Sequence, residues 1–229
     1  TDRGSPLSLS DLIAQIISLP GHFRVRLSSI EPLEISSDLI QLIASHEAIC
    51  PHLHIPLQSG SDRILGLMNR NYTYQDYRRV VDTIRMKIPD LALSTDCLVG
   101  FPEESEKDFE TTCRAIEAIG FNRAHIFPFS PRSLTRTSSA PVLSGEKIKR
   151  RLKIIRDKAD RTAQKLRQRM EGETVTVIAE NKGEGGGISG LDEYYNRVIA
   201  AGGSAEPGDF CRMTITSGEG KICRGEVMD

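Results

Sequence analysis

Residues 53–61 read LHIPLQSGS, an apolar run that leads directly into a polar turn containing a glycine. Two other stretches repeat this order. The alternating residues 23–27 lead into residues 28–32 (SSIEP), and the apolar residues 91–99 lead into residues 96–102 (DCLVGFP). Apolar or alternating runs of this length predict β-strands. Each of the three predicted strands therefore ends in groups that can hold a polar ligand.

Helical patterns separate these strands and predict a parallel sheet. Residues 37–43 have helical apolar spacing, and a further strand is predicted at residues 124–129. Thr73 with Asp76 and Ser105 with Asp108 have the spacing of capping boxes, which predicts helices over residues 73–86 and from residue 106 to a stop at Gly120. Alternating strands and helices indicate parallel strands with helical crossovers. Four strands do not close a barrel, so the sheet is either open or continued by strands upstream of Thr1.

The charge of the chain is concentrated in one segment. The 229 residues are 38% hydrophobic with a net charge of −1, which suits one large domain, or a domain with a small module. Residues 142–171 carry 11 basic and 4 acidic residues, a net charge of +7, whereas residues 1–141 and 172–229 are net acidic. Apolar residues recur every three or four positions from Ile148 to Met170, which predicts an amphipathic helix over residues 146–170 with its basic face in solvent.

Residues 172–229 have a different pattern. Strands are predicted at residues 174–177, 195–199 and 210–215, with glycine-rich turns between them, as in a small β-barrel. We therefore divide the chain into residues 1–141, 142–171 and 172–229. No uninterrupted apolar stretch is long enough to span a membrane, and the first residues are not a signal peptide, so a cytoplasmic location is expected. Five widely spaced cysteines argue against a disulfide framework.

The polar strand ends together predict a ligand site, because ligands of parallel α/β folds lie beyond the carboxyl ends of the strands. Gly60 and Gly100 would allow close approach of the backbone to a ligand. Serine, glutamine and aspartate side chains offer the hydrogen bonds that a ribose or an amino-acid group needs. Any one of the motifs alone fits ordinary turn and cap chemistry, and only their equivalent positions favour a site. His52 and His54 are expected on one face, as site-lining or framework residues without a metal.

Longer motifs carry a family resemblance. Residues 26–32 (RLSSIEP), 50–62 (CPHLHIPLQSGSD), 95–102 (TDCLVGFP) and 127–132 (FPFSPR) resemble successive strands of the radical-SAM methylthiotransferases. Residues 172–229 resemble their tRNA-binding TRAM domain. The resemblance implies a partial radical-SAM (β/α) barrel, its last four strands, followed by a TRAM-like barrel. It also implies a transferase that uses S-adenosylmethionine and 4Fe-4S clusters to convert a C–H bond of tRNA into C–S–CH3. The motifs are most similar to the branch acting on N6-threonylcarbamoyladenosine at position 37.

The sequence departs from the family pattern at several positions. It contains no C-x-x-x-C-x-x-C motif, and its cysteines stand alone, so they are expected to be buried thiols. The cluster cysteines are expected upstream of Thr1, which leaves catalytic residues unassigned and this chain alone inactive. Glu103 and Leu134 stand where the family usually has glycine, and Tyr194 where asparagine is common.

The resemblance and the net charge of +7 together predict two groups of site residues, and the helix of residues 146–170 is expected to make an electrostatic contact with RNA. Glu31 could instead form a salt bridge or a cap, and the basic helix could be a solvated face. Since residues 172–229 are acidic, RNA contact there would need a local patch. The alternatives for the whole chain are a non-catalytic RNA-binding protein, a methylthiotransferase of another substrate branch, and another radical-SAM enzyme. The residues expected at S-adenosylmethionine are Ser29, Glu31, Gln58, Ser59, Gly60, Asp96 and Gly100. Those expected at tRNA are Arg132, Lys149, Arg150, Lys153, Tyr195, Arg197 and Arg212.

Overall fold

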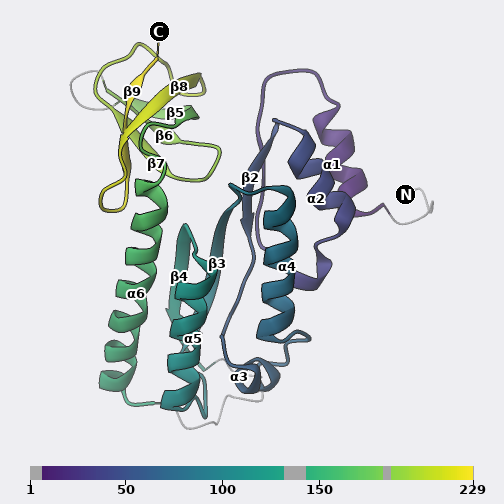
Figure 1. The fold of residues 1–229 in the computed structure, drawn as a ribbon, viewed down its shortest axis with the longest axis vertical. Helices are drawn as coiled ribbons and strands as arrows, with labels where there is room; N and C mark the ends of the chain where they lie inside the picture. The colour runs from purple at the N-terminus through teal and green to yellow at the C-terminus, as the bar shows by residue number, and fades with distance from the viewer. Residues whose placement is uncertain (1–6, 132–142, 183–186, 229) are drawn as a thin grey trace.

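The computed structural model describes residues 7–131, 143–182 and 187–228. A parallel sheet with helices is joined by one long helix to a small barrel (Figure 1). The elements before the barrel are α1 (Leu9–Ile17), β1 (Val25–Leu27), the 3-10 helix η1 (Pro32–Glu34), α2 (Ser37–Ser45), β2 (Ile49–His54), α3 (Asp62–Leu67), α4 (Tyr74–Lys87), β3 (Ala92–Val99), α5 (Glu106–Ile119), β4 (Arg123–Pro128) and α6 (Gly145–Gln168).

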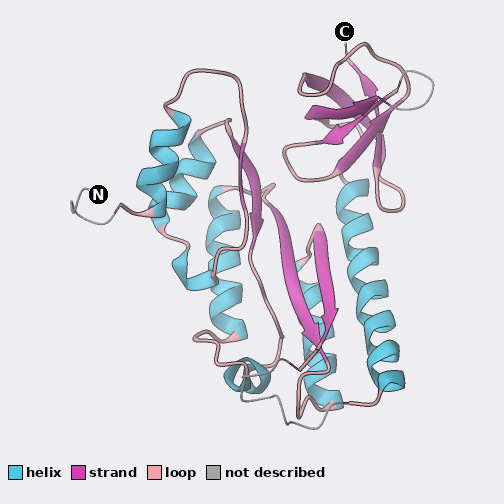
Figure 2. Ribbon diagram, turned by 180° about the vertical axis from the view of Figure 1, so that it is seen from behind, coloured by secondary structure: helices cyan, strands magenta, loops and turns pink. Residues whose placement is uncertain are grey.

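The sheet has four parallel strands in the order β1-β2-β3-β4, as the alternating pattern predicts. Helices α4, α5 and α6 lie along one face of it, and the strands are seen from the other face in Figure 2. All strand arrows point to the same end of the sheet, the end at which α3 lies. The predicted strand at residues 53–57 begins and ends earlier, at Ile49–His54, so the polar turn follows it after a short extended segment.

The predicted helix starts are confirmed by their hydrogen bonds. The Thr73 hydroxyl accepts from the Asp76 backbone N–H, and the Asp76 carboxylate accepts from the Thr73 N–H; Ser105 and Asp108 repeat this exchange. Helix α5 ends at Gly120, whose φ of 72° lies in the left-handed region that glycine adopts readily. These local contacts orient the crossover helices against the buried core of the sheet.

Helix α6 packs its apolar stripe on the sheet domain. Ile155, Ala159 and Ala163 are buried, as the spacing predicts. The expectation that the basic residues all face solvent is wrong for two of them, because Arg151 and Arg167 are buried as well. The Arg167 guanidinium donates to the Gly220 carbonyl of the barrel, so one arginine helps to join helix and barrel.

The described strands that follow α6 form a closed barrel in the order β5-β6-β7-β9-β8. Its inside is filled by apolar residues, including Val177, Val198 and Met213. The strand predicted at residues 195–199 starts at Arg197, and two short strands, β6 and β9, were not predicted. The strands are β5 (Thr174–Lys182), β6 (Ile188–Leu191), β7 (Arg197–Ala200), β8 (Phe210–Ser217) and β9 (Cys223–Val227).

The barrel docks at the end of the sheet where the strands begin, opposite the strand ends (Figure 1). Arg26 of β1 donates to the Asp192 carbonyl at 3.0 Å. Tyr195 follows in the same turn, and its ring lies 4.5 Å from the Arg26 guanidinium and 5.4 Å from that of Arg123 on β4. This turn therefore contacts both outer strands of the sheet at once.

A candidate ligand site at the carboxyl end of the sheet

The three polar turns lie side by side and are hydrogen-bonded to one another. The Ile30 N–H donates to the His54 carbonyl at 3.1 Å, and the Gln58 N–H donates to the Asp96 carbonyl at 2.9 Å. Ser29 and Gln58 both have positive φ values, 58° and 60°, which a residue with a side chain rarely adopts. Backbone strain of this kind is common where a site must hold a ligand.

Three of the predicted cofactor residues have side chains open to this edge. Ser29 is exposed, Gln58 is half-buried, and the Asp96 side chain is 31% exposed. Glu31 is partly exposed but forms the salt bridge considered as its alternative, with Arg70 Nη1 2.6 Å from its carboxylate. The edge therefore offers a hydroxyl, an amide and a carboxylate on neighbouring strand ends.

The other three predicted cofactor residues pack against the neighbouring structure. The Ser59 hydroxyl is buried 3.1 Å from the Thr112 hydroxyl of α5. A Cβ on Gly60 would lie 2.7 Å from the Ala115 Cβ, closer than carbon atoms can approach, so glycine is needed here for packing. The Gly100 N–H donates to the Glu104 carboxylate at 2.8 Å. These three residues therefore shape the turns, whereas Ser29, Gln58 and Asp96 are the ones open to the edge.

A row of buried polar groups leads to Asp96 on the face of the sheet away from the helices. The Ser94 hydroxyl lies 2.9 Å from His52 Nε2 and 3.0 Å from His54 Nδ1, so the histidines share one face as predicted. His54 Nε2 lies 3.3 Å from the Asp96 carboxylate. Among the described residues, His52 Nδ1 and His54 Nε2 are buried without a well-aligned hydrogen bond. Burial, with Arg26 nearby, lowers the pKa of His52 to about 3, so its imidazole is neutral.

A buried ion pair supports the turn after β3, and sequence reasoning missed it. Arg151 Nη1 lies 2.6 Å from the carboxylate of Glu104, and both side chains are almost completely buried. Nη2 of the same guanidinium lies 3.0 Å from the Glu106 carboxylate. Arg151 is three residues after Ile148 and four before Ile155, so helical spacing alone places it beside the apolar stripe. That spacing is the signal from which the burial of Arg151 could have been predicted.

Glu103 occupies a backbone position that suits glycine. Its φ of 65° lies in the left-handed region, at the position where the family resemblance led us to expect glycine. Its carbonyl accepts from Arg63 Nη2 at 2.5 Å, and the same nitrogen donates to Asp108 at 2.6 Å. The contact with Arg63 fixes the turn although the side chain of Glu103 is itself exposed.

The cysteines of this chain do not fit an iron–sulfur cluster. All five are free and buried, as expected. Burial is the main cause that raises the pKa of Cys113 and of Cys223 to about 11, which opposes the thiolate form that binds metal. Within the described ranges, no group of three potential metal ligands comes together.

The predicted RNA residues fall into separated groups. Lys149 and Lys153 are exposed on the first half of α6, far from the barrel (Figure 1), and Arg150 beside them pairs with Glu106. On the barrel, Arg197 lies 2.5 Å from the Glu180 carboxylate and Arg212 is exposed. Arg132 lies outside the described residues.

Tyr195 has partners other than RNA. Its half-buried ring lies 4.9 Å from the His52 ring, in addition to its contacts with the two arginines of the sheet. The structure thus uses this tyrosine to join barrel and sheet.

The sheet domain is a parallel α/β sheet with its polar groups gathered at the strand ends, and residues 4–116 match the Radical SAM superfamily. Coproporphyrinogen III oxidase from Escherichia coli, described as a radical SAM enzyme, has the same fold, with a TM-score of 0.55 at 16% identity over 67% of this chain and 37% of its own. The chain belongs, by sequence, to the radical-SAM methylthiotransferase family.

Two curated relatives illustrate this similarity. The threonylcarbamoyladenosine tRNA methylthiotransferase of Thermotoga maritima is 38% identical over all of this chain and 52% of its own length. The tRNA-2-methylthio-N(6)-dimethylallyladenosine synthase of Saccharophagus degradans is 39% identical over 86% of this chain and 44% of its own length. The chain thus spans about half the length of the curated relatives it matches. No helix within the described ranges is long and apolar enough to cross a membrane.

Proposed function

We propose that the chain contributes the S-adenosylmethionine-binding edge and the RNA-binding part of a tRNA methylthiotransferase. The similarity along the whole chain to a threonylcarbamoyladenosine tRNA methylthiotransferase carries this proposal. The substrate we propose is the threonylcarbamoyladenosine at position 37 of tRNA, modified at C2. The dimethylallyladenosine relative, equally similar in identity, makes the other substrate branch the second candidate.

At the sheet edge, Ser29, Gln58 and Asp96 are the proposed contacts to S-adenosylmethionine. The Asp96 carboxylate and the Gln58 amide suit the ammonium and carboxylate groups of an amino acid or the hydroxyls of a ribose. Glu31 is held by Arg70, and Ser59, Gly60 and Gly100 fix the turns that position these side chains. When bound, S-adenosylmethionine supplies the methyl group and the adenosyl group on which the chemistry of this family depends.

The small barrel is proposed to be a TRAM-like module that binds tRNA. Its closed order of five strands and its attachment to a basic helix support this assignment. Because the cysteines of this chain do not fit a cluster, we propose that the 4Fe-4S ligands are residues outside this chain.

The substrate can be tested in cells that lack tRNA methylthiolation. The complete gene containing this chain is expressed, and the tRNA nucleosides are separated and identified by mass spectrometry. We expect 2-methylthio-N6-threonylcarbamoyladenosine. A 2-methylthio derivative of dimethylallyladenosine alone would assign the other branch, and no methylthiolated nucleoside together with retained tRNA binding would support the non-catalytic alternative.

A further inference from the structure

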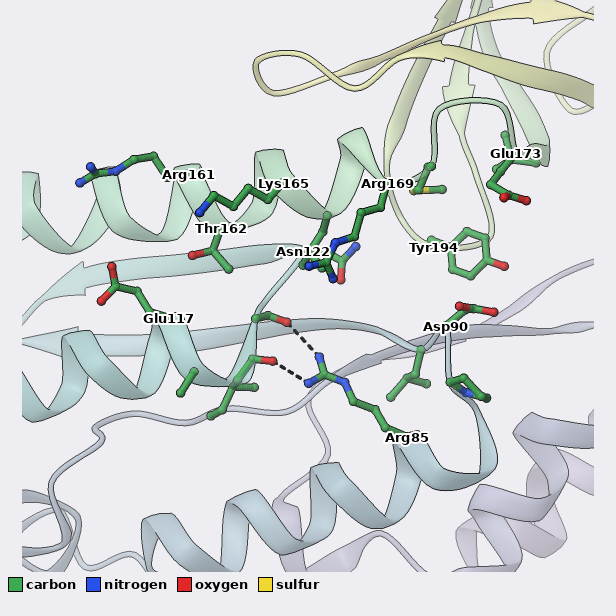
Figure 3. Close-up of a pocket in the computed structure, with 18 of the residues that line it drawn as sticks. Arg85, Asp90, Glu117, Asn122, Arg161, Thr162, Lys165, Arg169, Glu173 and Tyr194 are labelled. Carbon is green, nitrogen blue, oxygen red and sulfur yellow. Dashed lines mark hydrogen bonds between the residues drawn. The ribbon is translucent and has the colours of Figure 1, made fainter.

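A basic cavity of about 920 Å³ lies between the helices of the sheet domain and the barrel (Figure 3). It is on the helix-covered side and near the start of the strands, away from the proposed S-adenosylmethionine edge. The second half of α6 contributes Arg161 and Lys165 to its wall, the C-cap of α6 contributes Arg169, and the barrel contributes Tyr194. The helix of residues 146–170 was expected as a whole to contact RNA, but none of these four residues was among those named individually.

The three cations of α6 are free of carboxylate partners among the described residues. All three are exposed, and Arg161 bonds only to the Asp157 carbonyl of its own helix. Nearby Lys158, in contrast, is paired with Glu117 at 2.8 Å. Arg85 at the floor donates to the carbonyls of residues 119 and 120 at 2.6 and 3.0 Å (Figure 3). Within the described part of the chain, Arg85 likewise forms no ion pair with a carboxylate at hydrogen-bonding distance.

The acidic groups of the cavity lie at both of its ends, and Glu117, below Thr162 in Figure 3, is paired with Lys158 at 2.8 Å. Asp90 and Glu173 lie on either side of the Tyr194 ring in Figure 3, whereas the row of cations extends away from it along α6. A negatively charged ligand is consequently attracted to the α6 wall, where the unpaired cations lie.

The spacing of the row suits a chain of phosphates. Residues four apart on a helix are separated by about 6 Å along its axis, so the row from Arg161 to Arg169 extends over about 12 Å. A single phosphate contacts one or two of these cations, whereas successive phosphates of one nucleic-acid strand can contact all three. Tyr194, half-buried at the end of the row, offers an aromatic ring of the kind on which bases stack.

We propose that this cavity, lined by Arg161, Lys165, Arg169 and Tyr194, holds a stretch of the phosphate backbone of the RNA substrate. The proposal rests on the proposed function, since it takes the ligand to be tRNA. Tyr194 belongs to the same barrel turn as Tyr195, and the proposal adds a contact surface on the side of this turn that faces the helices. The RNA is thereby held where helix α6 meets the barrel, at a distance from the reacting edge.

The test measures binding of a fluorescein-labelled tRNA transcript to the 229-residue chain by fluorescence anisotropy at several salt concentrations. The cavity variant is R161Q/K165Q/R169Q. The matched control, K87Q/K107Q/R114Q, removes the same charge from exposed positions on α4 and α5. Each phosphate contact adds about 0.7 to 0.9 to the slope of log affinity against log salt. The cavity variant removes three cations, so it should flatten this slope by about 2 to 3. The control should change it by less than 1.

A second variant tests the tyrosine without relying on charge. Tyr194→Leu keeps apolar bulk against the barrel core but removes the aromatic face. It should weaken binding several-fold and leave the salt slope unchanged, with an unaltered thermal melt. If the wild type binds tRNA and the cavity variant has the same salt slope, the proposed RNA contact in the cavity is refuted. The proposed function is not affected by that result. Failure of the wild type to bind tRNA at any salt concentration would overturn both.

Discussion

Replacing Arg151 should cost far more stability than replacing the arginine beside it. Arg151→Met removes contacts of 2.6 Å to Glu104, 3.0 Å to Glu106 and 5.0 Å to the centre of the Phe109 ring. It leaves the buried Glu104 carboxylate without its cation. Removing one partner of a buried pair costs about 3–5 kcal/mol. Arg150→Met breaks an exposed pair with Glu106 and should cost about 0–1 kcal/mol.

The pH dependence of this loss has a definite sign. Burial is the main cause that raises the pKa of Glu104 already in the wild type, and removing Arg151 raises it further. The part of the loss that comes from the unpaired Glu104 charge is therefore fully present above the folded pKa of Glu104 in the variant. It disappears as the pH falls below the folded pKa of Glu104 in the wild type, where the carboxyl group is protonated in both folded proteins.

Urea-induced unfolding followed by circular dichroism measures these differences. We expect the loss at pH 7 to shrink at pH 4.5, and the double variant Arg151→Met/Glu104→Gln to recover part of it at pH 7. Equal free energies of unfolding for the Arg151 and Arg150 variants would refute the claim that burial makes this pair important.

Four further variants or measurements test the turns and the polar row. Glu103→Gly should raise the free energy of unfolding by up to about 1 kcal/mol, because it relieves a left-handed φ; a lower melting temperature would contradict this. Gly60→Ala should cost about 1–3 kcal/mol in urea unfolding, because its Cβ would overlap Ala115. Asp96→Asn should abolish methylthiolation by the complete protein while the melting temperature stays within a few degrees; full activity would remove Asp96 from the site. The His52 Cε1–H signal should not titrate in NMR spectra between pH 7 and 4.5, and stability should fall as the pH drops below 6.5, because only the unfolded imidazole binds a proton there.

Features set by neighbouring residues could be predicted from the sequence. Both predicted capping boxes are present because their partners lie three residues apart. The same signal occurs at Ser8 and Asp11, and it would have located α1. Helix α3 and strand β6 are only 6 and 4 residues long, and such short elements depend on tertiary contacts more than on periodicity.

Features set by distant residues could not be predicted. The equivalence of the strand ends predicted the polar edge, but the direction of each side chain depends on register. Ser59 turns inward because Thr112, 53 positions later, accepts or donates its hydrogen bond. Likewise, Arg151 is buried because Glu104 lies beneath it, 47 positions earlier in the chain. No local pattern contains either pairing.

The Ser94 hydroxyl carries a single hydrogen atom, and this has a consequence for two histidines. If that hydrogen points to His54 Nδ1, His52 Nε2 must carry the proton that Ser94 accepts, and His54 carries its own on Nε2, toward Asp96. The reverse orientation would set a lone pair of His54 against the carboxylate. The tautomers of the two imidazoles are thus coupled, and the negative charge of Asp96 selects one proton order for the whole row.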